Sequence, residues 1–137
     1  MTSSLVGSEM CIRDRERRCD IINSSGADMV ISIHQNSYVT PKAEGAQVFY
    51  YKKSEESKRI AQIMQGILGE KLGTTRQIKS DVNYYILLHS KLPTIISECG
   101  FLSNPEEEQR LCTEEYQEKV ADALYCGIIE YLMINMK

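Results

Sequence analysis

Short apolar runs alternate with longer amphipathic stretches along this chain. The runs are rich in β-branched and aromatic residues and predict four strands, at residues 29–33, 45–51, 84–88 and 94–98. The run 29–33 is mostly apolar, which is typical of a strand buried on both faces of a parallel sheet. The polar stretches 35–44 and 73–83 predict loops.

Helical spacing is clearest in residues 54–72, where Ser54 is suited to the N-cap. One face of this helix is apolar: Ile60, Ile63, Met64, Ile67, Leu68 and Leu72. A last helix is predicted at about 114–133, and its apolar stripe has the same spacing: Tyr116, Val120, Leu124, Ile128 and Tyr131. Both stripes indicate packing against a core.

Start and stop signals in the sequence predict two shorter helices. Asn104-Pro105 followed by two acids is a strong helix start, with an N-cap residue and proline at the first helical position. Residues 16–25 have helical spacing, with Cys19, Ile21 and Ile22 on one side, and end at Gly26. Strands that alternate with helices predict an α/β fold with a mostly parallel, twisted sheet flanked by helices.

The 137 residues suffice for one domain and are too few for two. Residues 4–15 read SLVGSEMCIRDR, which is too short and too polar for a secretory signal. This string resembles translated sequencing-adapter read-through. We therefore expect residues 1–15 to be a non-native or disordered tail and residues 16–137 to form the domain.

Composition and charge exclude several classes of function. Sixteen Lys+Arg against 19 Asp+Glu give a net charge of −3, so we expect no nucleic-acid partner, because phosphate recognition needs a concentrated positive face. No apolar run approaches the roughly 18 residues of a membrane-spanning helix. The five cysteines include no CxxC pair, which excludes a zinc ribbon and a thioredoxin-type motif and favours buried small side chains.

Two of the predicted strands end in residues that can carry chemistry. His34 follows the run 29–33, and Glu98 ends the run 94–98. Active sites of open α/β sheets lie beyond the carboxyl ends of strands, where an imidazole can bind zinc and a carboxylate can act as a base. The same residues also fit a hydrogen-bonded surface histidine and a carboxylate that caps a helix or pairs with a cation. His89 lies in a polar stretch and is most simply solvated.

Two motifs resemble signatures of the zinc-dependent N-acetylmuramoyl-L-alanine amidases. Residues 27–36, ADMVISIHQN, are similar to that family's AD-x-x-x-SIH-x-N segment, and Arg18 and Asn23 fit its R-x-x-x-x-N lead-in. Residues 98–104, ECGFLSN, are similar to its E-x-GFLSN signature, and residues 45–51 with the helix after them also match. The resemblance covers residues 16–132 and is strongest to the amidases that endospore-forming bacteria use on spore-cortex peptidoglycan.

The resemblance implies an activity and roles for particular residues. His34 would be a zinc ligand, and Glu98 would be the catalytic carboxylate that takes a proton from a zinc-bound water. The reaction would hydrolyse the amide between the lactyl group of muramic acid and L-alanine of the stem peptide. Asn36 would orient the site, and Cys99 would be structural. Peptidoglycan would be the substrate, which places the protein outside the cytoplasm, at the cell wall or the forespore cortex.

The resemblance also leaves a gap. The family has two further zinc ligands, a histidine in a GHGG-like turn after the first strand and a glutamate that follows it, and this sequence shows neither motif. A catalytic zinc site needs three protein ligands. We therefore expect residues 16–137 to be the carboxyl-terminal portion of an amidase domain that lacks the first strand or strands. Its sheet would have an uncovered edge that promotes association, and its activity would be impaired.

Two other classes of function remain open. A non-catalytic peptidoglycan-binding or interaction module would keep the fold without metal. A Rossmann-like regulatory domain has less support, because no glycine-rich phosphate loop follows a predicted strand.

Overall fold

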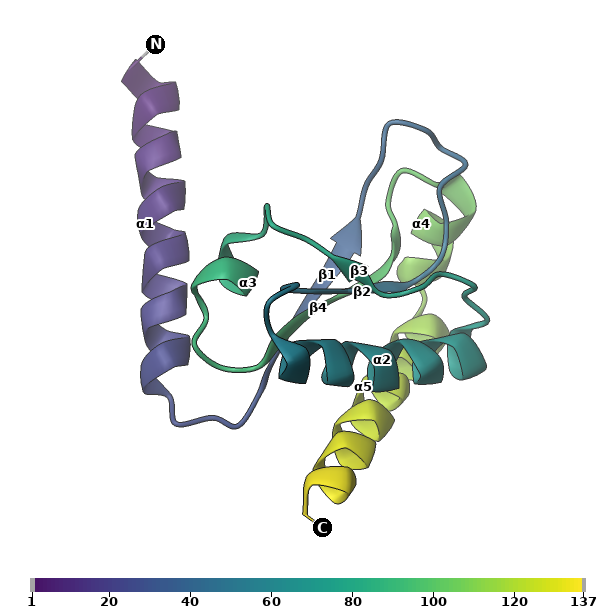
Figure 1. The fold of residues 1–137 in the computed structure, drawn as a ribbon. Helices are drawn as coiled ribbons and strands as arrows, with labels where there is room; N and C mark the ends of the chain where they lie inside the picture. Colours follow the sequence, from purple (N-terminus) through teal and green to yellow (C-terminus); the bar gives the residue numbers. More distant parts are fainter. Residues whose placement is uncertain (1, 137) are drawn as a thin grey trace.

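A β-sheet organises residues 2–136, the part of the chain that the computed structural model describes (Figure 1). The elements in chain order are α1 (Thr2–Ser24), β1 (Val30–Asn36), β2 (Gln47–Tyr50), α2 (Glu55–Leu72), β3 (Lys79–Ser80), α3 (Tyr85–His89), β4 (Thr94–Phe101), α4 (Pro105–Leu111) and α5 (Glu114–Asn135).

The four strands lie in the order β1-β4-β2-β3. β1 pairs with β4, and β2 with β3, in parallel, whereas β2 and β4 are antiparallel. β4 is an interior strand, and all 8 of its residues are buried. The prediction of an α/β fold with a mostly parallel sheet is confirmed.

The main core lies between one face of the sheet and helices α2 and α5 (Figure 1). Ile60 and Met64 of α2 are each 1% exposed, and Ile95 of β4 is fully buried. The apolar stripes predicted for both helices face this core, which confirms them. The two helices approach closely at Gly127, where an added Cβ would lie 2.5 Å from Sδ of Met64.

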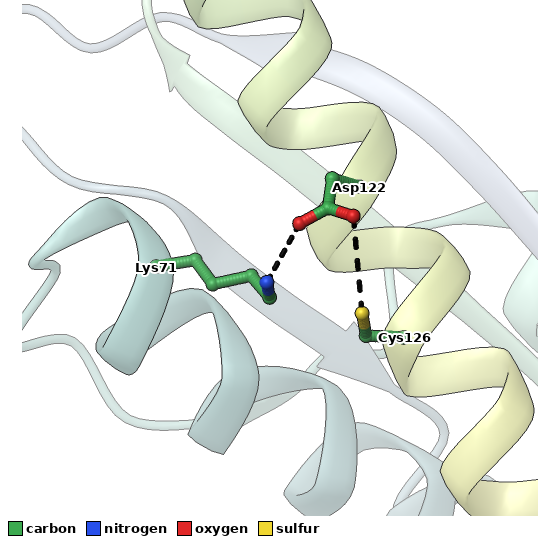
Figure 2. Close-up of polar contacts among 3 residues, drawn as sticks. All are labelled: Lys71, Asp122 and Cys126. Atoms are coloured by element: carbon green, nitrogen blue, oxygen red, sulfur yellow. Dashed lines mark hydrogen bonds and ion pairs between the residues drawn. The ribbon is translucent and has the colours of Figure 1, made fainter.

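A polar contact at the solvent side joins the same two helices (Figure 2). Nζ of Lys71 on α2 lies 2.6 Å from Oδ2 of Asp122 on α5, and Sγ of Cys126 lies 4.0 Å from the other carboxylate oxygen. Because both charged side chains are exposed, this ion pair contributes little beside the apolar packing.

The opposite face of the sheet carries a smaller cluster. Phe49, Leu87 and Ile96 are buried there, and the ring of Tyr84 packs edge-on against Phe49 with centroids 5.6 Å apart. Helix α3 covers this face, and α1 packs against α3. The arrangement leaves polar side chains at one end of the same face.

Residues 84–88 differ from their prediction. The sequence predicts a strand, which is wrong, because Tyr85–His89 forms helix α3. The amides of Leu87 and Leu88 both bond to the carbonyl of Tyr84, which closes a helical turn. A short apolar run fits a strand or a buried helical turn equally well, and here the turn buries Leu87 against Phe49 and Ile96.

β1 is longer and more exposed than predicted. It extends through His34 to Asn36, across an irregularity in its pairing with β4. Ile33 is 60% exposed, so the expectation of a strand buried on both faces is wrong. The reason is that β1 is an edge strand of the sheet formed by residues 2–136, paired with β4 alone.

Smaller differences concern the first helix and one loop. Residues 2–24 form one helix, which includes most of the short helix predicted at 16–25, and Arg18 pairs with Asp14 at 2.9 Å along it. Cys19 is buried, as the prediction for the cysteines has it, but Cys11 and Cys112 are exposed, for which that prediction is wrong. Ile21 is 60% exposed and faces away. The helix stops before Gly26, which has a φ of 70°, as its sequence indicates. The predicted loop 73–83 contains the short strand β3.

The predicted starts of two helices are confirmed. The side chain of Ser54 accepts a hydrogen bond from the amide of Ser57 at 3.2 Å. The side chain of Asn104 accepts from the amides of Glu106 and Glu107, each at 3.1 Å. Both side chains satisfy backbone donors that a helix leaves unpaired.

Candidate active site

The structure brings the two candidate residues of the sequence together. His34 and Glu98 are register partners on the parallel strands β1 and β4. Paired positions of neighbouring strands project to the same face of a sheet, so the imidazole and the carboxylate lie side by side. This face is the one that also carries the cluster around Phe49.

Glu98 is a buried carboxylate with an incomplete set of partners. The residue is 3% exposed, and Oε1 accepts a hydrogen bond from the phenol of Tyr84 at 3.1 Å. Oε2 is buried and has no hydrogen-bond partner among the described residues. Burial raises the pKa of Glu98, while the bond from Tyr84 and the charge of His34 act in the opposite direction. Most buried polar atoms in proteins have a partner, so this oxygen is available to a ligand or a water.

His34 is exposed, in contrast to Glu98. Its Nε2 lies 2.9 Å from the hydroxyl oxygen of Ser32, two residues earlier on the same face of β1. A hollow of about 270 Å³ lies on this side of the pair and is lined by Ser32, His34, Tyr84 and, from α1, Arg15 and Arg18. The imidazole is therefore accessible to a ligand.

The described residues supply no complete metal site. No group of three or more His, Cys, Asp or Glu side chains in this part of the chain is placed to hold a metal ion. His34 and Glu98 offer one imidazole and one carboxylate, whereas a catalytic zinc site uses three protein ligands. The donor set within residues 2–136 does not fit a zinc centre by itself.

Cys99 follows Glu98 but belongs to the opposite face. It packs in the main core, and it lines a different pocket, one formed with Tyr116 of α5. Burial raises the pKa of its thiol to about 11, so it is a thiol and not a thiolate at neutral pH. These contacts fit the structural role expected for Cys99.

Asn36 and His89 are two other polar residues that the sequence offers near the predicted site. The side-chain oxygen of Asn36 accepts from the amide of Ser37 at 2.9 Å, and its carbonyl accepts from the amide of Leu102 at 2.8 Å. Asn36 thus shapes the end of β1. His89 is exposed and stacks on Tyr85 at the end of α3.

A second hollow lies on the other side of Glu98 and is hereafter the Arg76 cleft. It measures about 590 Å³, and its lining includes Asn36, Gln47, Arg76, Tyr84 and Phe101. Gln47 is the register partner of Glu98 on β2, and Tyr84 donates to Glu98. The cleft is therefore contiguous with the surroundings of the carboxylate.

Sequence reasoning missed Tyr84 and Arg76. Tyr84 is the N-cap residue of α3, the helix that occupies the predicted strand, and from there its phenol donates to Glu98. Its pKa is raised to about 12 by burial and by the nearby carboxylate. Arg76 lies in a stretch predicted as a loop, and nothing in the sequence around it indicates a partner in β2.

Comparison with known proteins identifies the family. A family model described as N-acetylmuramoyl-L-alanine amidase matches residues 5–130. The chain belongs to this amidase family. The resemblance found in the sequence is thereby confirmed.

Individual amidases match over most of this chain, which spans between half and two thirds of their own length. The germination-specific N-acetylmuramoyl-L-alanine amidase of Bacillus subtilis is 40% identical over 119 residues, which cover 86% of this chain and 50% of the relative. The structure of the CwlD amidase from Clostridioides difficile in complex with the GerS lipoprotein superposes with a TM-score of 0.83 and 39% identity, covering 87% of this chain and 61% of that one. An N-acetylmuramoyl-L-alanine amidase from Clostridium difficile 630 gives a TM-score of 0.81 and 32% identity, covering 86% of this chain and 64% of that one. The match to a germination-specific amidase agrees with the narrower resemblance.

Proposed function

We propose that this chain acts on peptidoglycan as an N-acetylmuramoyl-L-alanine amidase, cleaving the amide between the muramic acid lactyl group and L-alanine of the stem peptide. The observation that carries the proposal is the position of Glu98, buried beside His34, with one oxygen that no described residue occupies. Membership of the amidase family and the names of its relatives support the substrate class.

Glu98 supplies the acid–base part of this chemistry. Burial raises its pKa, and a carboxylate whose pKa is closer to the working pH is a stronger base toward the attacking water. The phenol of Tyr84 occupies Oε1, so Oε2 is the oxygen that accepts a proton from the attacking water and passes it to the leaving amine. The residue thus serves in turn as base and acid, and no nucleophilic cysteine or serine is needed.

A zinc-activated water requires donors in addition to His34. Because the described residues hold no group of three ligands, we propose that this 137-residue chain binds zinc weakly and that its hydrolysis is impaired. His34 would contribute one imidazole. Zinc, when bound, would polarise the amide carbonyl and lower the pKa of water.

The test measures peptide release and zinc content separately. The purified chain is incubated with peptidoglycan sacculi at rising zinc concentrations, and released stem peptide is quantified by chromatography and mass spectrometry. We expect slow, zinc-dependent release that Glu98→Gln abolishes. Release that is absent at every zinc concentration would refute the amidase activity. One tightly held zinc per chain after dialysis would refute the proposed impairment.

A non-catalytic peptidoglycan-binding module is the second candidate, favoured by the incomplete donor set of residues 2–136. Sedimentation with sacculi in the presence of a chelator distinguishes the two. Binding that persists without zinc and in Glu98→Ala, together with no peptide release, supports the binding module.

We further propose that the protein acts outside the cytoplasm, at the cell wall or the spore cortex. Its relatives include a germination-specific amidase and proteins named as cell wall amidases. No helix within residues 2–136 combines the length and apolarity needed to cross a membrane. Fractionation of sporulating cells, with immunodetection in the cortex and cytoplasmic fractions, tests this location.

A further inference from the structure

The Arg76 cleft has a positively charged lining. Arg76, Lys42 and Lys79 contribute to it, and Asp81 is the single carboxylate among its lining residues. This local excess of positive charge occurs in a chain whose net charge is −3. A concave site lined by one sign of charge attracts ligands of the other sign.

Arg76 is held in place by neutral partners. Its Nε donates to the carbonyl oxygen of Glu44, and Nη1 donates to Oε1 of Gln47 at 3.1 Å. The guanidinium carbon Cζ lies over the ring of Phe101, 4.7 Å from its centroid. These contacts fix the orientation of the guanidinium and leave its charge unneutralised.

No ion pair found among the described residues includes Arg76. A guanidinium carries five N–H donors, and the bonds to Glu44 and Gln47 use two of them. The remaining donors fit the two oxygens of a carboxylate, the geometry that arginine recognises best. An arginine fixed before the ligand arrives loses less conformational entropy on binding.

The negative charge of Asp81 opposes an anionic ligand, but its carboxylate is engaged in a hydrogen bond within its own turn. One of its carboxylate oxygens accepts a hydrogen bond from the amide of Asn83, just before α3. Lys42 and Lys79 are exposed and add positive charge at the rim. The cleft therefore retains a net attraction for an anion.

The cleft is also close to the reacting group. Gln47 bonds Arg76 and is the register partner of Glu98, while Tyr84 lines the cleft and donates to Glu98. We propose that the Arg76 cleft is a carboxylate-binding subsite, which receives an acidic residue of the stem peptide while the scissile amide lies at Glu98. This inference rests on the proposed amidase function and adds a substrate preference to it: stem peptides with a free carboxylate near L-alanine.

The experiment measures binding and needs no turnover. The ¹⁵N-labelled chain is titrated by NMR, at constant ionic strength, with N-acetyl-L-alanyl-D-glutamate and with its uncharged counterpart, N-acetyl-L-alanyl-D-glutamine amide. We expect the acid to shift the Nε–H signal of Arg76 and the amide signal of Phe101. We expect the uncharged peptide to bind at least about tenfold more weakly.

Variants assign this difference to one side chain. Arg76→Gln should abolish the preference for the acid, and Arg76→Lys, which keeps the charge but loses the planar fork, should retain part of it. Arg110→Gln is the matched control, because Arg110 also lies over an aromatic ring, that of Tyr116, at 5.7 Å, and does not line the cleft. If Arg76→Gln does not fold, Arg76→Lys and the two peptides on the unaltered chain still decide.

Equal affinity of the unaltered chain for the two peptides would overturn the proposal. So would inorganic phosphate that competes as well as the acidic peptide, since the cleft would then be a general anion site. A chain that binds the acid through Arg76 but releases no stem peptide would refute the amidase activity alone. A chain that releases stem peptide but binds both probes alike would refute the subsite alone.

Discussion

Glu107 is a buried carboxylate that ties together two segments beside the Arg76 cleft. Its Oε1 accepts a hydrogen bond from the amide of Gly45 at 2.6 Å, and its Oε2 accepts one from the amide of Phe101 at 2.6 Å. The residue is 7% exposed. Gly45 precedes β2, and Phe101 ends β4 beneath the guanidinium of Arg76. Both bonds therefore affect the stability of the sheet and the shape of the cleft.

Glu107→Gln preserves the size of the side chain and removes one of its acceptors. The amide group then directs an NH₂ donor at one of the two backbone N–H groups. A hydrogen bond to a charged acceptor contributes about 1.5–3 kcal/mol, and one to a neutral acceptor about 1 kcal/mol. Two charged bonds are exchanged for one neutral bond, so we expect the free energy of unfolding to fall by about 2–5 kcal/mol. This is a large part of the roughly 5–15 kcal/mol typical of a domain.

Urea unfolding followed by far-UV circular dichroism measures this loss. Glu106→Gln is the matched control, because Glu106 lies in the same first turn of α4 and is exposed. We expect the control to remain within about 0.5 kcal/mol of the unaltered chain. Hydrogen exchange of the Gly45 and Phe101 amides should accelerate in Glu107→Gln and stay unchanged in the control.

Equal stability of Glu107→Gln and Glu106→Gln, with unchanged exchange at both amides, would show that the two bonds contribute nothing to the folded state. If Glu107→Gln cannot be purified, Glu107→Asp provides the measurement. It keeps the charge and shortens the reach, so its unfolding midpoint should lie below that of Glu106→Gln.

Three further predictions concern other buried positions. Burial raises the pKa of Glu98 in the folded chain above its value in the unfolded chain. Its contribution to stability is therefore present below the unfolded pKa and is lost as pH rises through the folded pKa. Glu98→Gln should accordingly raise Tm relative to the unaltered chain more at about pH 8 than at about pH 4. Gly127→Ala places a Cβ 2.5 Å from Sδ of Met64 and should lower the free energy of unfolding by about 1–2 kcal/mol, although alanine favours helix. Cys99, whose pKa burial raises to about 11, should resist iodoacetamide at about pH 8 while exposed Cys112 is modified, as peptide mass spectrometry would show.

Each of these has a clear contrary result. A Tm difference for Glu98→Gln that is the same at both pH values would mean that the carboxylate is as well solvated folded as unfolded. A stabilised Gly127→Ala would mean that Met64 moves aside without cost. Equal labelling of Cys99 and Cys112 would mean that the carboxyl end of β4 opens readily.

Residues with a periodic pattern or a local capping signal were predictable from sequence. The stripe that includes Ile60 and Met64 and the caps at Ser54 and Asn104 occur as expected, since each depends on neighbours within a few residues. The motifs also led to His34 and Glu98, although their adjacency depends on the register of β1 and β4.

The features that sequence did not predict depend on distant partners. Tyr84 donates to Glu98 from the start of a helical turn, and that turn is stabilised by the packing of Leu87 against Phe49 and Ile96. Arg76 acquires its orientation from Gln47 and Phe101, which lie in other strands. The exposure of Ile33 follows from the place of β1 at the edge of the sheet, which a single strand's sequence does not encode.

The edge position of β1 has a consequence for the order in which the candidate site assembles. Helices α2 and α5 and strands β2 and β4 supply buried residues of the main core, whereas β1 pairs with β4 alone and adds the partly buried Ile31 to that core. The pairing of β1 with β4 closes the long stretch of chain between these two strands, which costs conformational entropy. Such non-local contacts form late in folding and compensate this cost only then. An opening of β1 separates the imidazole of His34 from Glu98 while the core stays intact. Far-UV circular dichroism would record such a species as folded, although its candidate site would be disassembled.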